Sequence, residues 1–266
     1  MVKPVILFRK DFDSEGEMEV ARKYFPVYEN RCAIPDNTFV IPRYSFLPYA
    51  QEFEHDMQAK NCYLINSYHQ HRSVADISTW AMDPLFEGLT PKTWDRLEDI
   101  PEHGPFVLKG ETNSKKFQFN THMYAENKKE AIQVYGRLLE DSLISQQKVY
   151  IRKFHPLVRL SQGFNGLPIS KEFRLFVAYG EVVGQGFYWA SHAQDIDVPA
   201  ADYPADFVKK LINLIGRGIN FFVMDIAQEE NGNWILIEIN DGCMSGPSCV
   251  DPEALYSNLA ERMSNI

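Results

Sequence analysis

The sequence predicts a mixed fold in which a small α/β unit with a parallel sheet is followed by an α+β region with antiparallel sheets. Over residues 1–95, short apolar strands alternate with amphipathic helices, as in parallel β–α–β units. Beyond the connector LEDIPEHGP, strand segments come in pairs joined by short turns. One of these turns contains Asn231-Gly232, a dipeptide that strongly favours a β-hairpin.

The first part is predicted to contain alternating strands and helices. Strands are expected at residues 5–8, 39–41 and 62–65, because each is a short apolar run bounded by polar or turn residues. Helices are expected at residues 16–25, 49–60 and 73–82, where apolar residues recur at helical spacing. Short loops between these elements favour one domain with a small parallel sheet over residues 1–95.

The second part, residues 96–266, is predicted to be richer in antiparallel strands. Residues 106–110 and 148–154 are expected strands, with a polar loop at 111–116 and a return strand near 117–119 between them. Two hairpins are expected, one joining 172–179 to 182–189 over Gly180-Glu181 and one joining 221–227 to 234–240. Helices are expected at 128–142, 205–215 and 252–263.

Composition excludes several classes of protein. The 27 basic and 36 acidic residues give a net charge of −9, which argues against a general binder of duplex nucleic acid or anionic membranes. No apolar stretch reaches the ~18 residues of a membrane span, and the N-terminal apolar run is too short for a signal peptide. The four cysteines form no CxxC pair and are expected to be reduced thiols. We therefore expect a soluble cytoplasmic protein.

The hairpin at Asn231-Gly232 brings polar residues together. If these two residues form a two-residue type I′ turn, Asp225 precedes the turn by as many residues as Glu238 follows it, so the two carboxylates lie opposite each other. Asn240 then points to the same face, and so do Leu236 and Val223.

Two facing carboxylates repel each other and normally destabilise a strand pair. A divalent cation removes the repulsion, and carboxylate and amide oxygens are ligands that Mg²⁺ accepts. The alternative is a solvated, mildly repulsive sheet face. Because apolar residues are expected on the same face, we predict that Asp225, Glu238 and Asn240 bind Mg²⁺.

The spacing Asp225…Glu238-Ile239-Asn240 resembles the magnesium signature of the ATP-grasp superfamily. Members of this superfamily use ATP to convert a carboxylate into an acyl phosphate, which they join to an amine or another nucleophile. Residues 106–109 resemble the strand whose lysine contacts the ATP phosphates, 148–154 the strand between the lobes that meets adenine, and 171–174 the strand that follows. Residues 65–93 resemble the last strand, helix and connector of the pre-ATP-grasp domain.

The chain is thus identified as resembling a small, single-chain, carboxylate–amine ligase-like member of a poorly characterised clade. The resemblance implies a pre-ATP-grasp domain over 1–95 and a two-lobed ATP-grasp domain over 96–266, with a smaller lobe at about 105–154 and a larger lobe at 155–266. It implies ATP and two Mg²⁺ ions as cofactors, and catalytic roles for Lys109 and Arg174. The residues it places on ATP are Lys109, Ser114, Lys115, Lys116, Arg152, Lys153, Phe154, Glu172 and Leu236.

This chain departs from the family pattern in its loop and in its arginine. A glycine-rich loop would follow Lys109, but residues 111–116 are ETNSKK, so that lysine ammoniums and the Ser114 hydroxyl would contact phosphate. Many ligases carry an arginine two residues before the first metal aspartate, where this chain has Val223, and Arg174 is the expected replacement.

Each predicted site residue also has a structural alternative: a strand-end lysine that reaches solvent for Lys109, a solvated pair for Lys115 and Lys116, an ion pair within the strand for Glu172 and Arg174, and a core position for Leu236. Arg43 could anchor a substrate carboxylate or belong to a turn, and residues 241–248 could hold the acceptor or form an ordinary loop. A nucleophilic role for Cys243 and a zinc site at His69-Gln70-His71 are not favoured.

The resemblance implies an ATP- and Mg²⁺-dependent ligase that joins a carboxylate to an amine on a small molecule, a peptide or a protein terminus. The alternatives are a nucleotide-binding regulatory or adaptor module without turnover, and phosphoryl transfer to a non-carboxylate acceptor. A membrane partner is not expected, and the acidic net charge disfavours nucleic acid.

Overall fold

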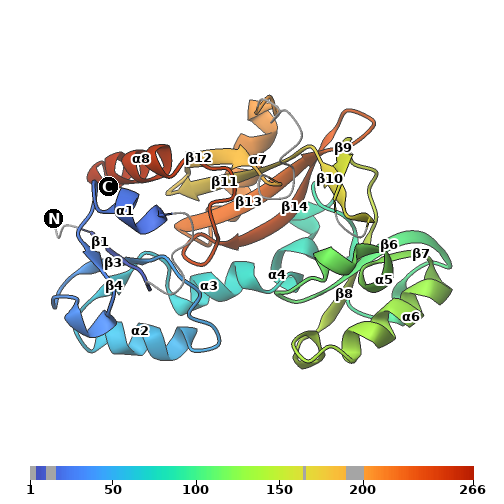
Figure 1. The fold of residues 1–266 in the computed structure, drawn as a ribbon, viewed down its shortest axis with the longest axis horizontal. Coiled ribbons are helices and arrows are strands. Elements are labelled where there is room, and N and C mark those ends of the chain that lie inside the picture. Colours follow the sequence, from blue (N-terminus) through green and yellow to red (C-terminus); the bar gives the residue numbers. More distant parts are fainter. Residues whose placement is uncertain (1–3, 10–15, 164–165, 190–200) are drawn as a thin grey trace.

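The computed structural model describes residues 4–9, 16–163, 166–189 and 201–266. Three larger sheets organise the chain: a parallel sheet near the N-terminus, a central antiparallel sheet, and an antiparallel sheet built from residues 93–153 (Figure 1). A short hairpin, β9 (Arg159–Gln162) with β10 (Pro168–Ser170), follows the third sheet. No helix within these ranges is long and apolar enough to cross a membrane.

The N-terminal sheet is parallel, as predicted, with strand order β2-β1-β3-β4. The strands are β1 (Val5–Leu7), β2 (Val27–Tyr28), β3 (Phe39–Pro42) and β4 (Tyr63–Leu64), with helices α1 (Glu17–Ala21) and α2 (Ala50–Gln58) between them. The sheet shares an apolar cluster with the central sheet, in which Ile6 and Ile41 pack with Phe176 and Val223. The two sheets are therefore held together by one core.

The helix expected at 73–82 is wrong in its bounds. The structure has α3 (Tyr68–Ala75) and α4 (Ser78–Ala81), separated at Asp76. Asp76 has extended backbone, and its carboxylate accepts hydrogen bonds from the backbone and hydroxyl of Ser78. This local capping competes with helix continuation.

The antiparallel sheet of residues 93–153 has the order β5-β8-β6-β7. Its strands are β5 (Thr93–Trp94), β6 (His103–Gly110), β7 (Tyr124–Asn127) and β8 (Val149–Lys153), and α6 (Lys128–Leu139) packs on it. The return strand expected near 117–119 is wrong, because residues 116–122 form two short helices, Lys116–Gln118 and α5 (Phe119–His122). Phe117 is 58% exposed, so the apolar–polar alternation there does not mark a buried strand face.

The central sheet has the order β12-β11-β13-β14. Its strands are β11 (Glu172–Ala178), β12 (Glu181–Phe187), β13 (Phe221–Gln228) and β14 (Trp234–Asp241). One face is apolar and is covered by α7 (Ala205–Ile215). The other face packs under α8 (Pro252–Ser264) and the parallel sheet at one end, and carries Glu172, Arg174 and Asp225 at the other. The charged end faces the antiparallel sheet of residues 93–153.

The hairpin between β13 and β14 differs from the predicted type I′ turn. Gly232 has a φ of +89°, but Asn231 does not adopt the positive φ that a type I′ turn requires. Gly232 N–H donates to Glu229 C=O at 2.9 Å, and Glu229 N–H donates to Asn233 C=O at 2.8 Å, so the loop is one residue longer than predicted.

A register shift between Asp225 and Ile226 compensates for the longer loop. Asp225 pairs with Glu238 as predicted, whereas Ile226 pairs with Leu236, and Ile237 is the extra residue between them. The shift turns Leu236 into the apolar cluster with Ile226. The prediction that Leu236 shares a face with Glu238 is therefore wrong.

Candidate functional site

A cavity of about 160 Å³ lies between the two antiparallel sheets. The predicted site residues that line it are Lys109, Ser114, Lys116, Arg152, Lys153, Phe154, Glu172 and Glu238. The predicted residues outside its lining are Lys115, Arg174, Asp225, Leu236 and Asn240. Eight residues that the sequence scatters over 130 positions thus meet at one opening.

Lys109 and Glu238 form an ion pair that joins the two sheets. Lys109 is the penultimate residue of β6 and is only 8% exposed, so it does not reach out to solvent. Burial alone would raise the pKa of Glu238, but Lys109, Lys116 and Arg174 outweigh it and lower the pKa to about 2. Glu238 is therefore an ionised oxygen donor at neutral pH.

Arg174 and Asp225 lie opposite each other on β11 and β13 and form a bidentate ion pair. Arg174 Nε donates to Asp225 Oδ1 at 2.9 Å, and Nη2 donates to Oδ2 at 2.8 Å. The third nitrogen, Nη1, donates to Gly246 C=O at 2.9 Å. Burial opposes the charge on Arg174, but Asp225 outweighs it and raises the pKa of the guanidinium. The alternative pairing of Arg174 with Glu172 is not observed.

The two lysines of the loop after β6 point to different partners. Lys116 contacts the Tyr188 hydroxyl, and its ammonium lies 4.5 Å from the centre of the Tyr188 ring and 5.7 Å from that of Trp189. Lys115 pairs with Asp141, away from the cavity. Lys116 is therefore the lysine placed to meet a phosphate.

Glu172 is a buried carboxyl group at the back of the cavity. Its Oε2 accepts hydrogen bonds from Trp189 Nε1 at 3.0 Å and from Ser170 Oγ at 3.3 Å. Burial and the nearby Asp225 raise the pKa of Glu172 to about 8. At neutral pH this group is mostly protonated, so it adds little negative charge to the site.

Arg152 acts as a clamp between segments. Its Nη1 donates to Ile237 C=O at 2.6 Å, and its Nη2 donates to Thr90 Oγ1 at 2.7 Å. The guanidinium carbon lies 5.5 Å from the centre of the Trp80 ring. Burial lowers the pKa of Arg152 to about 10. The clamp holds the bulged part of β14 beside the connector that follows α4.

The donor set proposed for Mg²⁺ consists of two carboxylates and one amide. Asp225 faces Glu238 across the strand pair, and Asn240, which is half-buried, lies two residues further along the same face. No cluster of three or more His, Cys, Asp or Glu side chains suited to a metal occurs among the described residues. Ionised oxygen donors fit a hard cation, although Arg174 and Lys109 supply the compensating charge here.

The sequence interpretation missed several residues of the site. Tyr188 and Trp189 follow β12, where they contact Lys116 and Glu172. The two adjacent aromatic residues at the end of a predicted strand were the available signal. Ile237 lines the cavity in place of Leu236, and no sequence signal marks the bulge that puts it there.

Arg43 is a structural residue and not a substrate anchor. Its guanidinium donates to Glu17 at 2.7 and 3.0 Å, to Tyr256 Oη at 3.2 Å and to Ser245 C=O at 2.9 Å, and it also contacts Gly242 C=O. It is 6% exposed. Arg43 therefore ties the N-terminal unit to α8 and to the segment that follows β14.

Two other residues considered from the sequence also have structural surroundings. Burial raises the pKa of the Cys243 thiol well above its usual range, which disfavours a nucleophilic thiolate. His71 is buried and its Nδ1 lies 3.1 Å from Asp241 Oδ2, so it is engaged by a carboxylate.

The architecture resembles that of several solved structures along almost its whole length. D-cycloserine synthetase DcsG superposes with a TM-score of 0.61 at 16% identity, covering 98% of this chain and 99% of that chain. ATP-grasp ligase PsnB, complexed with minimal precursor, Mg and ADP, gives 0.58 at 12% identity and covers 98% of each chain. Macrocyclase MdnC, bound with precursor peptide MdnA from Microcystis aeruginosa MRC, gives 0.57 at 11% identity, covering 99% of this chain and 100% of that chain. At these identities the likeness is one of fold.

No curated protein matches the sequence. The model of an ATP-grasp domain, family 3 of its clade, matches residues 96–259. This match confirms the predicted resemblance and, with the structural neighbours, the predicted fold class. The chain therefore belongs to this family of ATP-grasp domains.

Proposed function

We propose that this protein is an ATP- and Mg²⁺-dependent ligase that activates a carboxylate as an acyl phosphate and joins it to an amine. The observation that carries the proposal is the cluster of charges between the two antiparallel sheets. Lys109 and Lys116 line the cavity with Glu238, and Arg174 holds Asp225 on the neighbouring strands. Paired cations and ionised carboxylates are what a site for nucleotide phosphates and Mg²⁺ requires.

The reaction needs mainly positioning and stabilisation of charge. A carboxylate oxygen of the substrate forms a bond to the γ-phosphorus while the bond to the β,γ-bridging oxygen breaks, which leaves ADP and an acyl phosphate. The amine then forms a bond to the acyl carbon, and inorganic phosphate leaves. Lys109, Lys116 and Arg174 are the side chains placed to hold the transferring phosphoryl group. Bound Mg²⁺, held by Asp225, Glu238 and Asn240, would neutralise phosphate charge.

The nucleotide can enter only if the loop of residues 111–116 moves. A cavity of about 160 Å³ is smaller than the ~300–1,000 Å³ of typical ligand sites. The contacts from Lys109 to Glu238 and from Lys116 to Tyr188 cross this space. Closure of the same loop over bound nucleotide would exclude water and protect the acyl phosphate from hydrolysis.

The solved neighbours support a ligase that forms amide bonds, with a small molecule, a peptide or a protein terminus as substrate. One was solved with Mg and ADP, and another is a macrocyclase bound with a precursor peptide. The proposal includes two Mg²⁺ ions and a cytoplasmic location, as expected from the sequence.

A nucleotide-binding module without turnover is the second candidate. It is favoured by one observation: Asp225 and Glu238 are each already neutralised by a side-chain cation. In an active ligase, nucleotide phosphates must displace these contacts.

The test is release of ADP and phosphate by the purified protein with Mg²⁺ and pooled amino acids and peptides. Glu238→Gln should abolish substrate-dependent turnover, whereas Glu230→Gln, an exposed residue of the same hairpin, should leave it unchanged. ATP binding without turnover in any pool would favour the second candidate, and absence of ATP binding would contradict both.

A further inference from the structure

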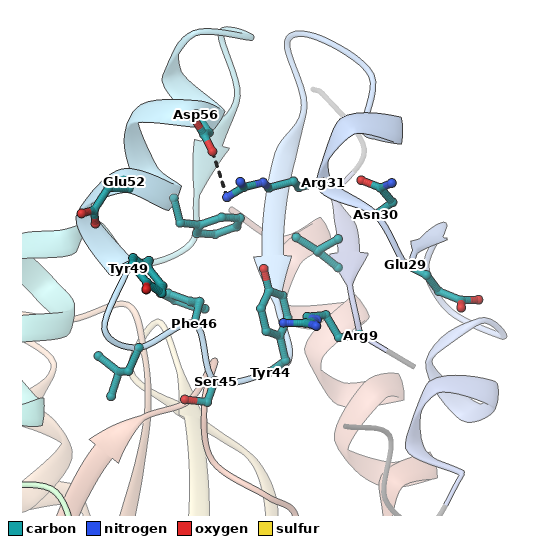
Figure 2. Close-up of a pocket in the computed structure, with 13 residues that line it drawn as sticks. Arg9, Glu29, Asn30, Arg31, Tyr44, Ser45, Phe46, Tyr49, Glu52 and Asp56 are labelled. Carbon is teal, nitrogen blue, oxygen red and sulfur yellow. Dashed lines mark ion pairs between the residues drawn. The ribbon is translucent and has the colours of Figure 1, made fainter. Parts of the chain in front are cut away.

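A second, larger cleft of about 750 Å³ lies in the N-terminal unit (Figure 2). It opens where the parallel strands end, with Leu7 at the end of β1, Asn30 and Arg31 after β2, and Tyr44 to Leu47 after β3. Helix α2 closes the opposite side with Phe53 and Asp56. None of its lining residues belongs to the cavity between the antiparallel sheets.

The sheet topology places this cleft where α/β sheets bind ligands. The chain passes from β1 to β2 on one side and then to β3 on the other side of β1. Strands whose connections leave in opposite directions open a crevice at their carboxyl ends, and ligands of open α/β sheets bind in such crevices. The cleft lies at this point, between the ends of β1 and β3.

One wall of the cleft consists of aromatic rings. Phe46 lies with its ring centre 4.9 Å from that of Phe53 and 5.8 Å from that of Tyr44. In Figure 2 the Tyr44 hydroxyl points along the cleft toward Arg31. Tyr49 is 64% exposed at the edge of this wall. Such a surface suits an aromatic or large aliphatic side chain.

The polar groups around the rings carry both charges. Arg31 and Asp56 form an ion pair at 2.8 Å across the cleft, and the Arg9 guanidinium lies 6.0 Å from the Tyr44 ring centre. Glu29 and Glu52 add two more carboxylates, so acidic side chains outnumber basic ones in the lining. This balance disfavours a nucleotide or another polyanion and favours a peptide, which carries amide dipoles and opposite terminal charges.

The cleft is connected to the charged end of the central sheet. Tyr44 directly follows Arg43, whose guanidinium donates to Ser245 C=O at 2.9 Å. Arg174 donates to Gly246 C=O, one residue further on, at 2.9 Å. The segment after β14 therefore lies between the wall of the cleft and the arginine that holds Asp225.

A second connection runs through α3. The His71 ring centre lies 6.2 Å from that of Phe46, and His71 Nδ1 lies 3.1 Å from Asp241 Oδ2. Asp241 directly follows Asn240, a proposed Mg²⁺ ligand. A ligand on the ring wall would thus lie one side chain away from the end of β14.

We infer that this cleft binds the peptide substrate of the ligase, with an aromatic or large aliphatic side chain of the peptide against the wall formed by Tyr44, Phe46, Tyr49 and Phe53. The statement that the bound peptide is a substrate rests on the proposed function. Binding of a peptide to the cleft does not, because the cleft and its chemistry are independent of the nucleotide cavity.

Direct binding is measured first, by NMR titration of the protein with the tripeptides Gly-Phe-Gly and Gly-Ser-Gly in the absence of ATP. Gly-Phe-Gly should bind more tightly. Tyr49→Ala should weaken its binding roughly fivefold to thirtyfold, as expected for loss of about 1–2 kcal/mol of apolar contact. Tyr63→Ala, a 70% exposed tyrosine on β4 outside the cleft, is the matched control and should bind like the wild type. Failure of Gly-Phe-Gly to bind, or equal binding by Tyr49→Ala, would overturn the inference.

Turnover then separates this inference from the proposed function. With a peptide that supports ADP release, Tyr49→Ala should raise the KM for the peptide and leave the KM for ATP unchanged. An unchanged KM for the peptide would place the substrate elsewhere while the ligase proposal stands. If no peptide supports turnover, but Tyr49→Ala still weakens Gly-Phe-Gly binding, the cleft is a peptide site and the ligase proposal fails.

Discussion

Replacement of Arg174 by methionine should destabilise the protein by about 3–5 kcal/mol, the usual cost of leaving one partner of a buried ion pair uncompensated. Asp225 is 1% exposed, and both of its oxygens accept hydrogen bonds from Arg174, at 2.9 and 2.8 Å. Methionine keeps most of the side-chain length but supplies neither the charge nor the donors. The Asp225 carboxylate would then remain in an apolar environment without water or a counter-ion.

The assay is urea unfolding followed by tryptophan fluorescence. Arg22→Met is the control, because Arg22 pairs with Glu19 and Glu29 at 2.9 and 2.6 Å on the surface, where such pairs contribute only about 0–1 kcal/mol. The double substitution Arg174→Met with Asp225→Asn should lose less stability than the sum of the single substitutions, because no charge is left unpaired.

A loss below about 1 kcal/mol for Arg174→Met would refute the reasoning, because it would equate this pair with a surface pair. Mg²⁺ gives a second readout that depends on the site and not on packing. With the Asp225 oxygens released, Mg²⁺ at about ten times its dissociation constant should stabilise Arg174→Met by roughly 1.4 kcal/mol. The wild type should gain less, because its two carboxylates are already neutralised.

Three further predictions concern single residues. Lys116→Met should raise the KM for ATP roughly tenfold, the effect of losing a charged hydrogen bond, whereas Lys115→Met, whose lysine points away from the cavity, should leave that KM within about twofold of the wild type. Burial raises the pKa of Glu172 to about 8 from its usual 4.5, so the folded protein retains a proton that the unfolded chain releases. Wild-type stability relative to Glu172→Gln should fall as pH rises from about 4.5 to about 8 and then level off, and urea unfolding across this range would contradict the assignment if the difference stayed constant. Gly232→Ala should cost about 1 kcal/mol because φ is +89° there, whereas Gly136→Ala, in α6 with open space around a Cβ, should stabilise by about 0.5–1 kcal/mol; urea midpoints of opposite sign check both.

Most of the fold could be predicted because apolar runs and punctuating residues set its elements. The helix expected at 205–215 coincides with α7, whose apolar stripe is unambiguous. The errors occur where polar side chains compete locally with periodicity. The carboxylate of Asp76 ends α3 and prepares α4, which apolar spacing over 73–82 does not reveal.

The pairing of Asp225 with Glu238 was predicted correctly although the turn was not. The loop of the hairpin is one residue longer than a type I′ turn, and the extra residue at Ile237 restores the register before Glu238. Apolar residues occupy both faces of β14 at this point, so alternation alone cannot detect the bulge. The same bulge moves Leu236 into the core and brings Ile237 to the cavity, an exchange that sequence reasoning missed.

The sequence located the charged residues of the site but not their partners. Glu172 and Arg174 share one face of a strand, yet residues two apart are farther from each other than residues directly opposite on paired strands. Arg174 therefore pairs with Asp225 across the sheet and leaves Glu172 to Trp189 and Ser170. A partner that comes from another strand depends on register, which only the folded sheet defines.

The charge balance of the site links nucleotide and metal binding. Lys109 neutralises Glu238 and Arg174 neutralises Asp225, so a free Mg²⁺ ion must compete with covalently tethered cations. Phosphate oxygens attract the same lysine and arginine, and each contact they take releases a carboxylate for the metal. Because coupling between two ligands is reciprocal, ATP should tighten Mg²⁺ binding by the same factor by which Mg²⁺ tightens ATP binding. Lys109→Met should weaken this coupling, since it leaves Glu238 available before the nucleotide arrives, and titrations of each ligand with and without the other measure it.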